Sequence, residues 1–407
     1  MRRVVVTGMG IVSSLGHTVP AAFDRLKEPR NCVAASADLS GYKGLRSCLW
    51  APSNFVRPER YTRKVVRTMS PVSMMALAAT EQALAQANLA GDPVVRSGRL
   101  GVAYGSCSGS VDANADFFTI LSNREVRNVT SATYIKMMSQ TCAVNLSVHL
   151  GTTGRLLPTG TACTSGSLAI GEAYEAIAWG RQDLMIAGGA EEFSVTQVAV
   201  FDTLFATSVR NAEPESTPRA FDAARDGLVI GDGAATLVLE EREHALARGA
   251  GILAEIVGFG TNTDGRHVTQ PNAATQAVAL KLALDGAGLS PCDIGYVNAH
   301  GTATEIGDIT EGEALSEVFG ESRPAVSTIK NYTGHTLGAC GAIEAAMTIE
   351  MLRHGWFAPN LNLTEPDARC GDHDFIMGRG REFETDFAMS NNFAFGGVNT
   401  SLIFRRV

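Results

Sequence analysis

Residues 160–166, with the sequence Gly-Thr-Ala-Cys-Thr-Ser-Gly, constrain the fold of this chain more than any other segment. They follow a β-prone stretch, and apolar residues at helical spacing come directly after them, which predicts a sharp turn from a strand into a helix. We expect that helix to end at Gly180. The cysteine of the turn, Cys163, would lie near free backbone N–H groups and the positive end of the helix dipole, which favour a thiolate. The segment alone leaves two interpretations open, a nucleophile or a small buried residue in a tight turn.

Strand-like and helix-like segments alternate along the rest of the chain, which predicts α/β layers. We expect strands at 4–7, 184–187, 236–240, 294–300 and 401–404. The first strand would be followed by a turn through Gly8 and Gly10, and the second would end at Gly188 and Gly189. We expect helices at 71–88, 242–248, 274–284, 308–319 and 339–354. A second half begins near residue 252, and residues 110–135 follow no regular pattern that separates a cap from a loop. Residues 166–173 and 341–345 have similar sequences, which favours a duplicated α/β unit.

The composition is that of a globular protein whose partners are small molecules or other proteins. The chain has 407 residues, of which 45% are hydrophobic, and a net charge of −8. It has no basic stripe or polybasic arm, so we expect neither nucleic-acid nor membrane binding. No segment approaches the ~20 apolar residues of a membrane span, and the glycine-interrupted start does not resemble a secretory signal. The eight cysteines are scattered and form no Cys-x-x-Cys pair, which argues against a metal site and for reduced thiols in a cytoplasmic protein.

Three further segments contain residues that suit catalysis. His300 lies where a strand runs into a polar, glycine-containing loop, and His335 follows Lys330 by five residues in a second glycine-containing loop. Phe395 precedes two glycines in a third loop. Each histidine taken alone is more often structural, the lysine could be a solvated surface residue, and the phenylalanine loop could be an ordinary turn.

Taken together, these segments resemble the β-ketoacyl-acyl-carrier-protein synthases of the bacterial elongating type, within the thiolase superfamily. The resemblance extends over essentially the whole chain and includes residues 4–12, 63–67, 221–227 and 231–233 besides the four candidate site segments. It implies a thiolase-like, five-layered αβαβα fold of two similar halves. Residues 1–250 would carry the nucleophilic cysteine, and residues 251–407 would carry both histidines. Such enzymes are usually dimers.

The resemblance also implies roles for the site residues. Cys163 would take an acyl chain as a thioester from the phosphopantetheine of an acyl carrier protein, and the backbone N–H groups of Cys163 and Phe395 would form an oxyanion hole. Neutral His300 and His335 would each donate an Nε2–H to the oxygen of a malonyl thioester and so stabilise the enolate left by loss of CO2. Lys330 would support this site, with Glu344 as its ionic partner.

The remaining implied roles concern substrate binding. Thr302 and Thr304 would hydrogen-bond the pantetheine arm, Phe395 would form a gate between the acyl pocket and the malonyl site, and Ser108 would line the acyl pocket. No metal or redox cofactor is expected.

Three residues depart from the family pattern. Pro158 lies in the expected strand before Cys163, so that strand must be short, bulged or paired on one side only. Ala394 replaces a glycine in the gating loop, where a Cβ would restrict positive φ. Ser108 is smaller and more polar than the aliphatic residue of many relatives, which leaves the acyl preference open.

The alternatives fall into several classes. A biosynthetic thiolase would have a second cysteine at His335, and Cys340 does not match that position; a plant-type polyketide synthase pairs its cysteine with one histidine and an asparagine. A non-catalytic chain-length partner would lack the nucleophile. The pathway stays open between general fatty-acid elongation and a dedicated polyene or polyketide pathway. In the second case the chain would form a heterodimer with an inactive paralogue instead of a homodimer.

Overall fold

The computed structural model describes residues 1–127 and 129–407. Within them, a mixed sheet of 11 strands has the order β13-β11-β10-β15-β16-β9-β1-β8-β6-β4-β5, and two small sheets, β12-β14 and β2-β3-β7, lie beside it. The strands are β1 (Val4–Ser13), β2 (Ala34–Ala35), β3 (Leu49–Ala51), β4 (Leu100–Gly105), β5 (Leu156–Thr159), β6 (Leu184–Glu191), β7 (Ile230–Gly231), β8 (Gly233–Glu241), β9 (Ala254–Thr263), β10 (Ile294–Asn298), β11 (Ala325–Ser327), β12 (Trp356–Phe357), β13 (Asp374–Phe375), β14 (Arg381–Glu382), β15 (Phe387–Phe393) and β16 (Val398–Arg405). The α-helices are α1 (Val19–Leu26), α2 (Pro71–Gln86), α3 (Val111–Asn123), α4 (Ser131–Met137), α5 (Thr141–Leu150), α6 (Ser165–Ala178), α7 (Val195–Thr203), α8 (Arg242–Ala247), α9 (Ala273–Ala287), α10 (Glu305–Phe319), α11 (Lys330–Thr333) and α12 (Cys340–His354).

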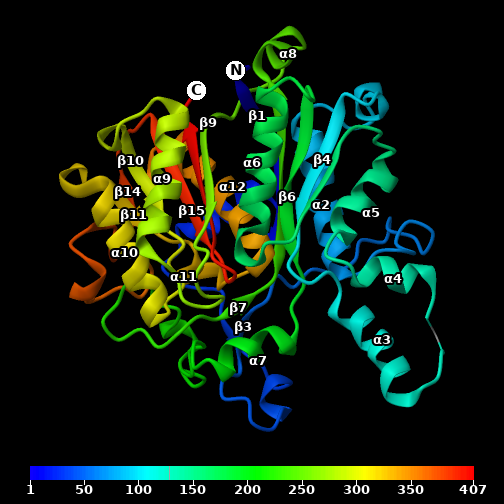
Figure 1. The fold of residues 1–407 in the computed structure, drawn as a ribbon, viewed down its shortest axis with the longest axis horizontal. Helices are drawn as coiled ribbons and strands as arrows, with labels where there is room; N and C mark the ends of the chain where they lie inside the picture. Colours follow the sequence, from blue (N-terminus) through cyan, green and yellow to red (C-terminus); the bar gives the residue numbers. More distant parts are fainter. Residues whose placement is uncertain (128) are drawn as a thin grey trace.

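These elements form five layers, as Figure 1 shows. Helix α2 covers β1 and β8 on one outer face, and α9 covers β9 and β16 on the other. Helices α6 and α12 lie between the two halves of the sheet and contact each other. The halves join where β1 pairs with β9 through residues 4–6. The expected αβαβα arrangement is confirmed.

The two halves of the sheet repeat one topology. From the join outward the order is β1-β8-β6-β4-β5 on one side and β9-β16-β15-β10-β11 on the other. In each half the second strand is antiparallel to both of its neighbours, and the next three strands are parallel to one another. Strands β5 and β11 lead toward the central helices α6 and α12, so these helices hold equivalent places. The division of the chain at residues 250 and 251 stays a prediction.

The central helices are largely buried because both sheet halves pack against them. In α12, residues 340–352 are all buried. The similarity between residues 166–173 and 341–345 has a packing reason at this crossing. A Cβ on Gly166 would lie 3.0 Å from the Ala342 nitrogen, and one on Gly341 would lie 2.7 Å from the Ser167 Cβ. The helices approach this closely only because both positions are glycine.

Two expected strand ends are wrong. We predicted a turn at Gly8 and Gly10, but β1 continues through both glycines to Ser13. Cβ atoms at these positions would lie 2.1 Å and 1.9 Å from carbonyl oxygens of α2, so the glycines let helix and strand pack closely instead of ending the strand. Strand β6 likewise continues through Gly188 and Gly189 to Glu191.

The segment at residues 110–135 contains two helices, α3 and α4, where the sequence showed no regular pattern. The inference from Pro158 is confirmed. Strand β5 is the edge strand of the sheet and pairs only with β4. A proline is tolerated there because its missing N–H faces away from the ladder. In the part of the chain that the structure describes, no helix is long and apolar enough to cross a membrane.

Candidate active site

Cys163 occupies the turn between β5 and α6, as the sequence predicts. The preceding Ala162 has a φ of 51°, a left-handed conformation that makes the turn sharp. Two side chains of the turn hold it in place. The Ser165 hydroxyl donates to the Ala162 carbonyl at 2.7 Å and accepts from the Thr161 N–H at 2.9 Å, while Thr164 donates to the Thr161 carbonyl at 2.7 Å. Cys163 itself is only 4% exposed.

The charge state of the Cys163 sulfur differs from our expectation. Burial raises the pKa of this thiol to about 11, although the charge of Lys330 and hydrogen bonds from the backbone of Phe395 and of Cys163 itself lower it. The helix N-terminus therefore does not by itself produce a thiolate near neutral pH, because desolvation outweighs it. The backbone hydrogen bonds of Cys163 and Phe395 nevertheless converge on the sulfur.

His335 faces the sulfur with the expected nitrogen. Its Nε2 lies 3.0 Å from Cys163 Sγ, and its Nδ1 accepts a hydrogen bond from the Leu337 N–H at 3.2 Å. Burial and the charge of Lys330 lower the pKa of His335 well below its usual value, so the ring is neutral. A neutral ring whose Nδ1 accepts must carry its proton on Nε2. His335 is therefore a hydrogen-bond donor to the site.

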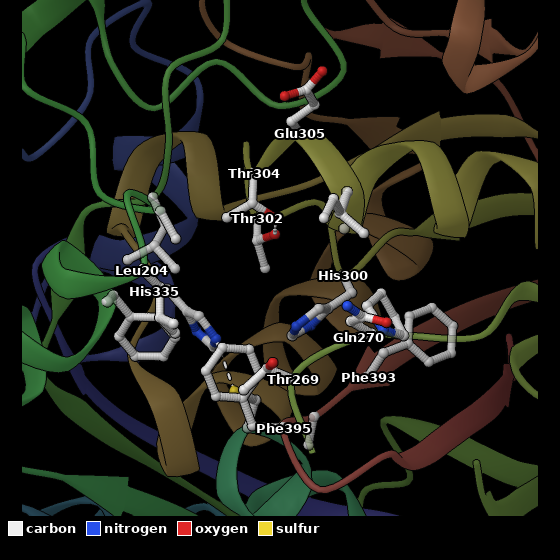
Figure 2. Close-up of a pocket in the computed structure, with 18 of the residues that line it drawn as sticks. Leu204, Thr269, Gln270, His300, Thr302, Thr304, Glu305, His335, Phe393 and Phe395 are labelled. Carbon is white, nitrogen blue, oxygen red and sulfur yellow. Dashed lines mark hydrogen bonds between the residues drawn. The ribbon is translucent and has the colours of Figure 1, made fainter. Parts of the chain in front are cut away.

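His300 reaches the same state by a different contact. Its Nδ1 lies 3.2 Å from Lys330 Nζ and 3.4 Å from Asn392 Nδ2, both of which are donors. Burial, Lys330 and His335 lower the pKa of His300 well below its usual value. Its Nε2 therefore also carries the proton. The two rings lie 5.3 Å apart at 87° and point toward one another across the cavity in Figure 2.

Lys330 and Glu344 form a buried ion pair, as predicted. Both side chains are at most 2% exposed. Burial lowers the pKa of Lys330, but the Glu344 carboxylate more than reverses this and keeps the ammonium charged. Asn392 donates to the other Glu344 oxygen at 2.6 Å, so Asn392 connects the ion pair to His300. We did not assign Asn392 from the sequence, although it lies in the Phe395 segment and a buried amide there needs partners.

The Phe395 loop is linked to the loop between β9 and α9. The Gly396 N–H donates to the Val268 carbonyl at 2.7 Å, and the Phe395 ring lies 5.1 Å from the ring of Phe201. Gly396 and Gly397 have positive φ, and Ala394 does not. The restriction that we expected from the Ala394 Cβ therefore does not arise in this conformation.

A cavity of about 520 Å³ joins these groups to the surface. Its walls include Cys163, both histidines and Phe395, together with Thr302 and Thr304, whose hydroxyls lie 2.9 Å apart. Figure 2 shows the two threonines above the histidines. Ser108 is not among the residues that line this cavity.

The comparisons with known proteins agree with this geometry. The model of the beta-ketoacyl synthase N-terminal domain matches residues 1–245, and that of the C-terminal domain matches residues 253–364. This chain belongs to the beta-ketoacyl synthase family. It is 38% identical to 3-oxoacyl-[acyl-carrier-protein] synthase 1 of Escherichia coli K12, with 100% of each chain covered.

Solved structures of the family have the same fold. A beta-ketoacyl synthase from Burkholderia phymatum STM815 is 56% identical, covers 100% of both chains and superposes with a TM-score of 0.98. The ishigamide ketosynthase/chain length factor is 28% identical over 100% of this chain and 99% of its own, with a TM-score of 0.91.

Within this family fold, two buried acidic residues that we did not assign position the site loops. The Glu311 carboxylate accepts hydrogen bonds from the backbone N–H groups of His300 and Gly301, each at 2.7 Å. Glu191 accepts the N–H groups of Cys107 at 2.7 Å and Gly338 at 3.2 Å, and so ties the Ser108 loop to the loop after His335. Burial raises their pKa values to about 8 and about 7 respectively. The sequence offered a signal only for Glu191, which follows the apolar stretch at residues 184–190, whereas Glu311 lies among several other acidic residues.

A third network fixes the threonine loop. Arg225 donates to the Thr304 carbonyl at 3.3 Å and lies 3.6 Å from Asp308. Asp308 in turn accepts the Ala303 N–H at 3.1 Å. Both charged side chains are at most 2% exposed, so this pair orders the loop that carries Thr302 and Thr304.

The site contains groups that could in principle hold a metal ion. Donor atoms of Cys163, His300 and His335 lie within 4.8 Å of one another, as do those of His300, Cys340 and Glu344. Zinc in the first set would require the unprotonated Nε2 of both histidines, and in the second set the carboxylate of Glu344 is already paired with Lys330. If the Nε2 protons moved to Nδ1, the Nδ1–H of His335 would face the Leu337 N–H and the Nδ1–H of His300 would face the Lys330 ammonium. Each contact would then bring two hydrogen-bond donors together, which is unfavourable. The hydrogen bonds therefore favour Nε2–H donors over metal ligands.

Proposed function

We propose that this chain is a β-ketoacyl-acyl-carrier-protein synthase that condenses an acyl group, held on Cys163, with a malonyl thioester. The observation that carries the proposal is the convergence of the Cys163 sulfur and two neutral histidines in one cavity. Their donor atoms lie within 4.8 Å of one another. The name of the E. coli relative supports the same reaction.

In the first half-reaction, the Cys163 sulfur attacks the carbonyl of an acyl thioester. The carbonyl oxygen takes up negative charge beside the sulfur. It would accept hydrogen bonds from the backbone N–H groups of Cys163 and Phe395, which in this structure point at the Cys163 sulfur. The C–S bond to pantetheine breaks, and the Cys163 proton ends on the pantetheine sulfur. Cys163 also belongs to an apolar cluster with Val198, Phe201 and Leu337, which supplies a hydrophobic environment for an acyl chain.

In the second half-reaction, a malonyl thioester loses CO2 and its carbon–carbon bond electrons pass to the thioester as an enolate. The Nε2–H groups of His300 and His335 would donate to the enolate oxygen as its charge grows. The enolate carbon then attacks the acyl carbonyl, and the bond to Cys163 breaks. The Cys163 sulfur leaves as a thiolate and takes up one proton from solvent, which restores the thiol for the next cycle. Because both histidines are neutral donors throughout, no proton transfer to them is required.

Lys330, Glu344 and the threonines would support these steps without contacting the reacting carbons. Lys330 keeps the His300 Nδ1 as an acceptor, and Glu344 keeps Lys330 charged. Thr302 and Thr304 would hydrogen-bond the pantetheine arm, which is part of the substrate and not a resident cofactor. We further propose that the enzyme is cytoplasmic and that its partners are an acyl carrier protein and a second ketosynthase chain.

General fatty-acid elongation is the pathway that we favour. The chain is 38% identical to the E. coli synthase and 28% identical to the ishigamide ketosynthase/chain length factor. The second candidate is a dedicated polyene or polyketide pathway with a heterodimeric partner. Elongation by the purified chain alone, without a paralogue, would separate the two.

Intact-mass spectrometry tests the first step directly. Incubation with acyl carrier substrates should add one acyl group to the protein, and Cys163→Ala should remove that mass shift. Cys142→Ala is a matched control, because Cys142 is buried but lies outside the cavity. Stoichiometric acylation of the Cys163→Ala protein would refute the proposal.

A further inference from the structure

A second cavity, which we call the aromatic pocket, lies apart from the catalytic cavity. Among the residues that the structure describes, the two cavities share no lining residue. The aromatic pocket has a volume of about 720 Å³, which is within the range of small-molecule sites. Its walls come from the end of α1 and the loop after it, from α11, from the end of α12, from β12, and from β14 with the turn before it.

Three of the side chains that line the aromatic pocket are rings that contact one another. Phe23 and His354 are stacked with ring centroids 4.6 Å apart, and Trp356 meets Phe23 edge to face at 5.8 Å. Tyr332 adds a fourth ring to the lining. A wall of aromatic faces and edges favours a ligand that is itself flat and aromatic, because such rings gain from stacked and edge-to-face contacts.

The hydroxyl of Tyr332 is the polar group of the pocket that needs a partner. Tyr332 is 0% exposed, and within residues 1–127 and 129–407 its hydroxyl has no hydrogen-bond partner. The large majority of buried side-chain polar atoms have one. A phenylalanine would fill the same space without burying an unsatisfied hydroxyl. Packing inside the chain therefore does not explain the hydroxyl, which points to a partner from outside it.

The Tyr332 hydroxyl is available as a donor. Burial raises the pKa of Tyr332, and the nearby charge of Arg25 only partly opposes this. The hydroxyl therefore keeps its proton over the physiological range. A neutral hydroxyl close to a guanidinium donates most strongly to an anionic acceptor.

The charged residues that line the pocket also favour an anion. They are Lys27, Arg379 and Glu382, two cations and one anion. Lys27 pairs with Asp24 at 3.0 Å, but these side chains are 46% and 74% exposed. An ion pair in water is weak, so the Lys27 ammonium remains able to attract a ligand.

We propose that the aromatic pocket is a binding site for a small flat aromatic molecule that carries one anionic group. The ring lies against Phe23 and Trp356, and the anionic group accepts the hydrogen bond from Tyr332 while Lys27 and Arg379 attract it. This inference goes beyond the proposed function and does not depend on it.

The place of the pocket connects it to the catalytic ion pair. Helix α11, which carries Tyr332, begins at Lys330, and helix α12, which carries Glu344, ends at His354. Lys330 and Glu344 are paired in the interior. A ligand in the aromatic pocket therefore contacts both helices that supply this pair.

Isothermal titration calorimetry tests the binding site with defined probes. The probes are 2-naphthoate, its neutral analogue 2-naphthamide, and adenosine monophosphate, which distinguishes a carboxylate from a phosphate as the anionic group. Tyr332→Phe removes only the unpartnered hydroxyl. Tyr104→Phe is a matched control, because Tyr104 is also 0% exposed but lines neither cavity, and its hydroxyl lies 3.0 Å from that of Thr236.

We expect 2-naphthoate to bind with a Kd of about 0.1–1 mM, as for a ligand of this size. Binding of 2-naphthamide, and binding of 2-naphthoate to Tyr332→Phe, should each be about tenfold weaker, the effect of losing one charge-assisted hydrogen bond. Tyr104→Phe should bind within about twofold of wild type, since its hydroxyl is outside the pocket. Whichever of 2-naphthoate and adenosine monophosphate binds more tightly identifies the anionic group.

Two further measurements locate the site without an activity assay. Bound 2-naphthoate should slow amide hydrogen exchange in α11 and β12 and leave the first turn of α6, beside Cys163, unchanged. Without ligand, the melting temperature should not fall in Tyr332→Phe, because no hydrogen bond is lost, whereas it should fall in Tyr104→Phe.

Four results would overturn the inference. Absence of binding by both anionic probes at about 10 mM would exclude a site of this kind. Equal affinity for 2-naphthoate and 2-naphthamide, or for wild type and Tyr332→Phe, would exclude the proposed recognition of the anion. Protection of the first turn of α6 instead of α11 would place the ligand in the catalytic cavity. A less stable Tyr332→Phe protein would show that the hydroxyl has a partner within the chain.

Discussion

Replacing Lys330 with methionine tests the electrostatic logic of the site. Lys330 and Glu344 are both almost completely buried, so Lys330→Met would leave a carboxylate without its cation in the interior. A buried charge that loses its partner costs about 3–5 kcal/mol. Glu344 can instead take up a proton, which at pH 7 costs a carboxyl with an ordinary pKa near 4.3 about 3.7 kcal/mol. The variant takes whichever of these two states has the lower free energy. We therefore expect the free energy of unfolding to fall by about 3–4 kcal/mol.

The double variant Lys330→Met/Glu344→Gln separates stability from chemistry. It removes both charges while keeping the shape of residue 344 and a partner for Asn392. Most of the lost stability should return, since replacing a buried ion pair by neutral groups is often close to neutral. Decarboxylation should not return, because His300 still lacks the ammonium beside its Nδ1. Through its contact with His300, loss of Lys330 should slow decarboxylation by about 10²–10³, the effect of losing one oxyanion donor.

The assays are urea unfolding followed by circular dichroism and release of labelled CO2 from a malonyl thioester. A Lys330→Met protein as stable as wild type would refute the ion-pair argument. A folded double variant that decarboxylates at the wild-type rate would refute the role given to Lys330. The two outcomes are independent, so each part of the reasoning can fail separately.

Three further predictions concern the two histidines, Cys163 and Ser108. His300→Ala and His335→Ala should each slow CO2 release by about 10²–10³ while Cys163 still forms an acyl-enzyme, and wild-type CO2 release would exclude that histidine from the oxyanion site. The pKa of Cys163 is raised to about 11 by burial; alkylation of its thiol by iodoacetamide should therefore rise about tenfold per pH unit from pH 7 to 9, and a plateau near pH 7 would contradict this. Ser108 does not line the cavity that contains Cys163, so its place at the acyl pocket stays a prediction. On that prediction, Ser108→Phe should reduce transfer of long acyl chains relative to short ones by about tenfold, the effect of overpacking by roughly 1–3 kcal/mol. An unchanged ratio of long-chain to short-chain acyl-enzyme would place the chain elsewhere.

The sequence predicted the elements of the fold better than their ends. The helices expected at 71–88, 274–284 and 339–354 agree with α2, α9 and α12 to within a few residues, because stretches rich in good helix formers favour a helix locally. The ends of β1 and β6 were wrong because glycine was taken as a turn signal. Gly8 and Gly10 allow close packing against α2, which lies more than 60 residues away in the chain, and the local sequence gives no sign of such a contact.

The reactive groups were predictable, whereas the groups that hold them were not. Cys163, His300, His335 and Lys330 lie in short glycine-containing segments that attract attention on their own. Glu191 and Asn392 act through distant backbone groups and other side chains, and their partners become evident only when the sheet brings them together. The same is true of the raised pKa of Cys163, since the helix terminus can be read locally and the burial cannot.

The duplicated architecture explains why the site is assembled from both halves of the chain. Helices α6 and α12 occupy equivalent places, and their first turns meet where Gly166 and Gly341 permit close approach. Cys163 precedes the first helix and His335 precedes the second, so packing the two helices brings the sulfur and the imidazole to 3.0 Å. In this central layer, residues 340–352 of α12 are all buried. Burial there disfavours an isolated charge, which lowers the pKa of both histidines and raises that of Cys163. A site built at such a crossing therefore has neutral N–H donors, and these suit a reaction whose negative charge appears on the substrate.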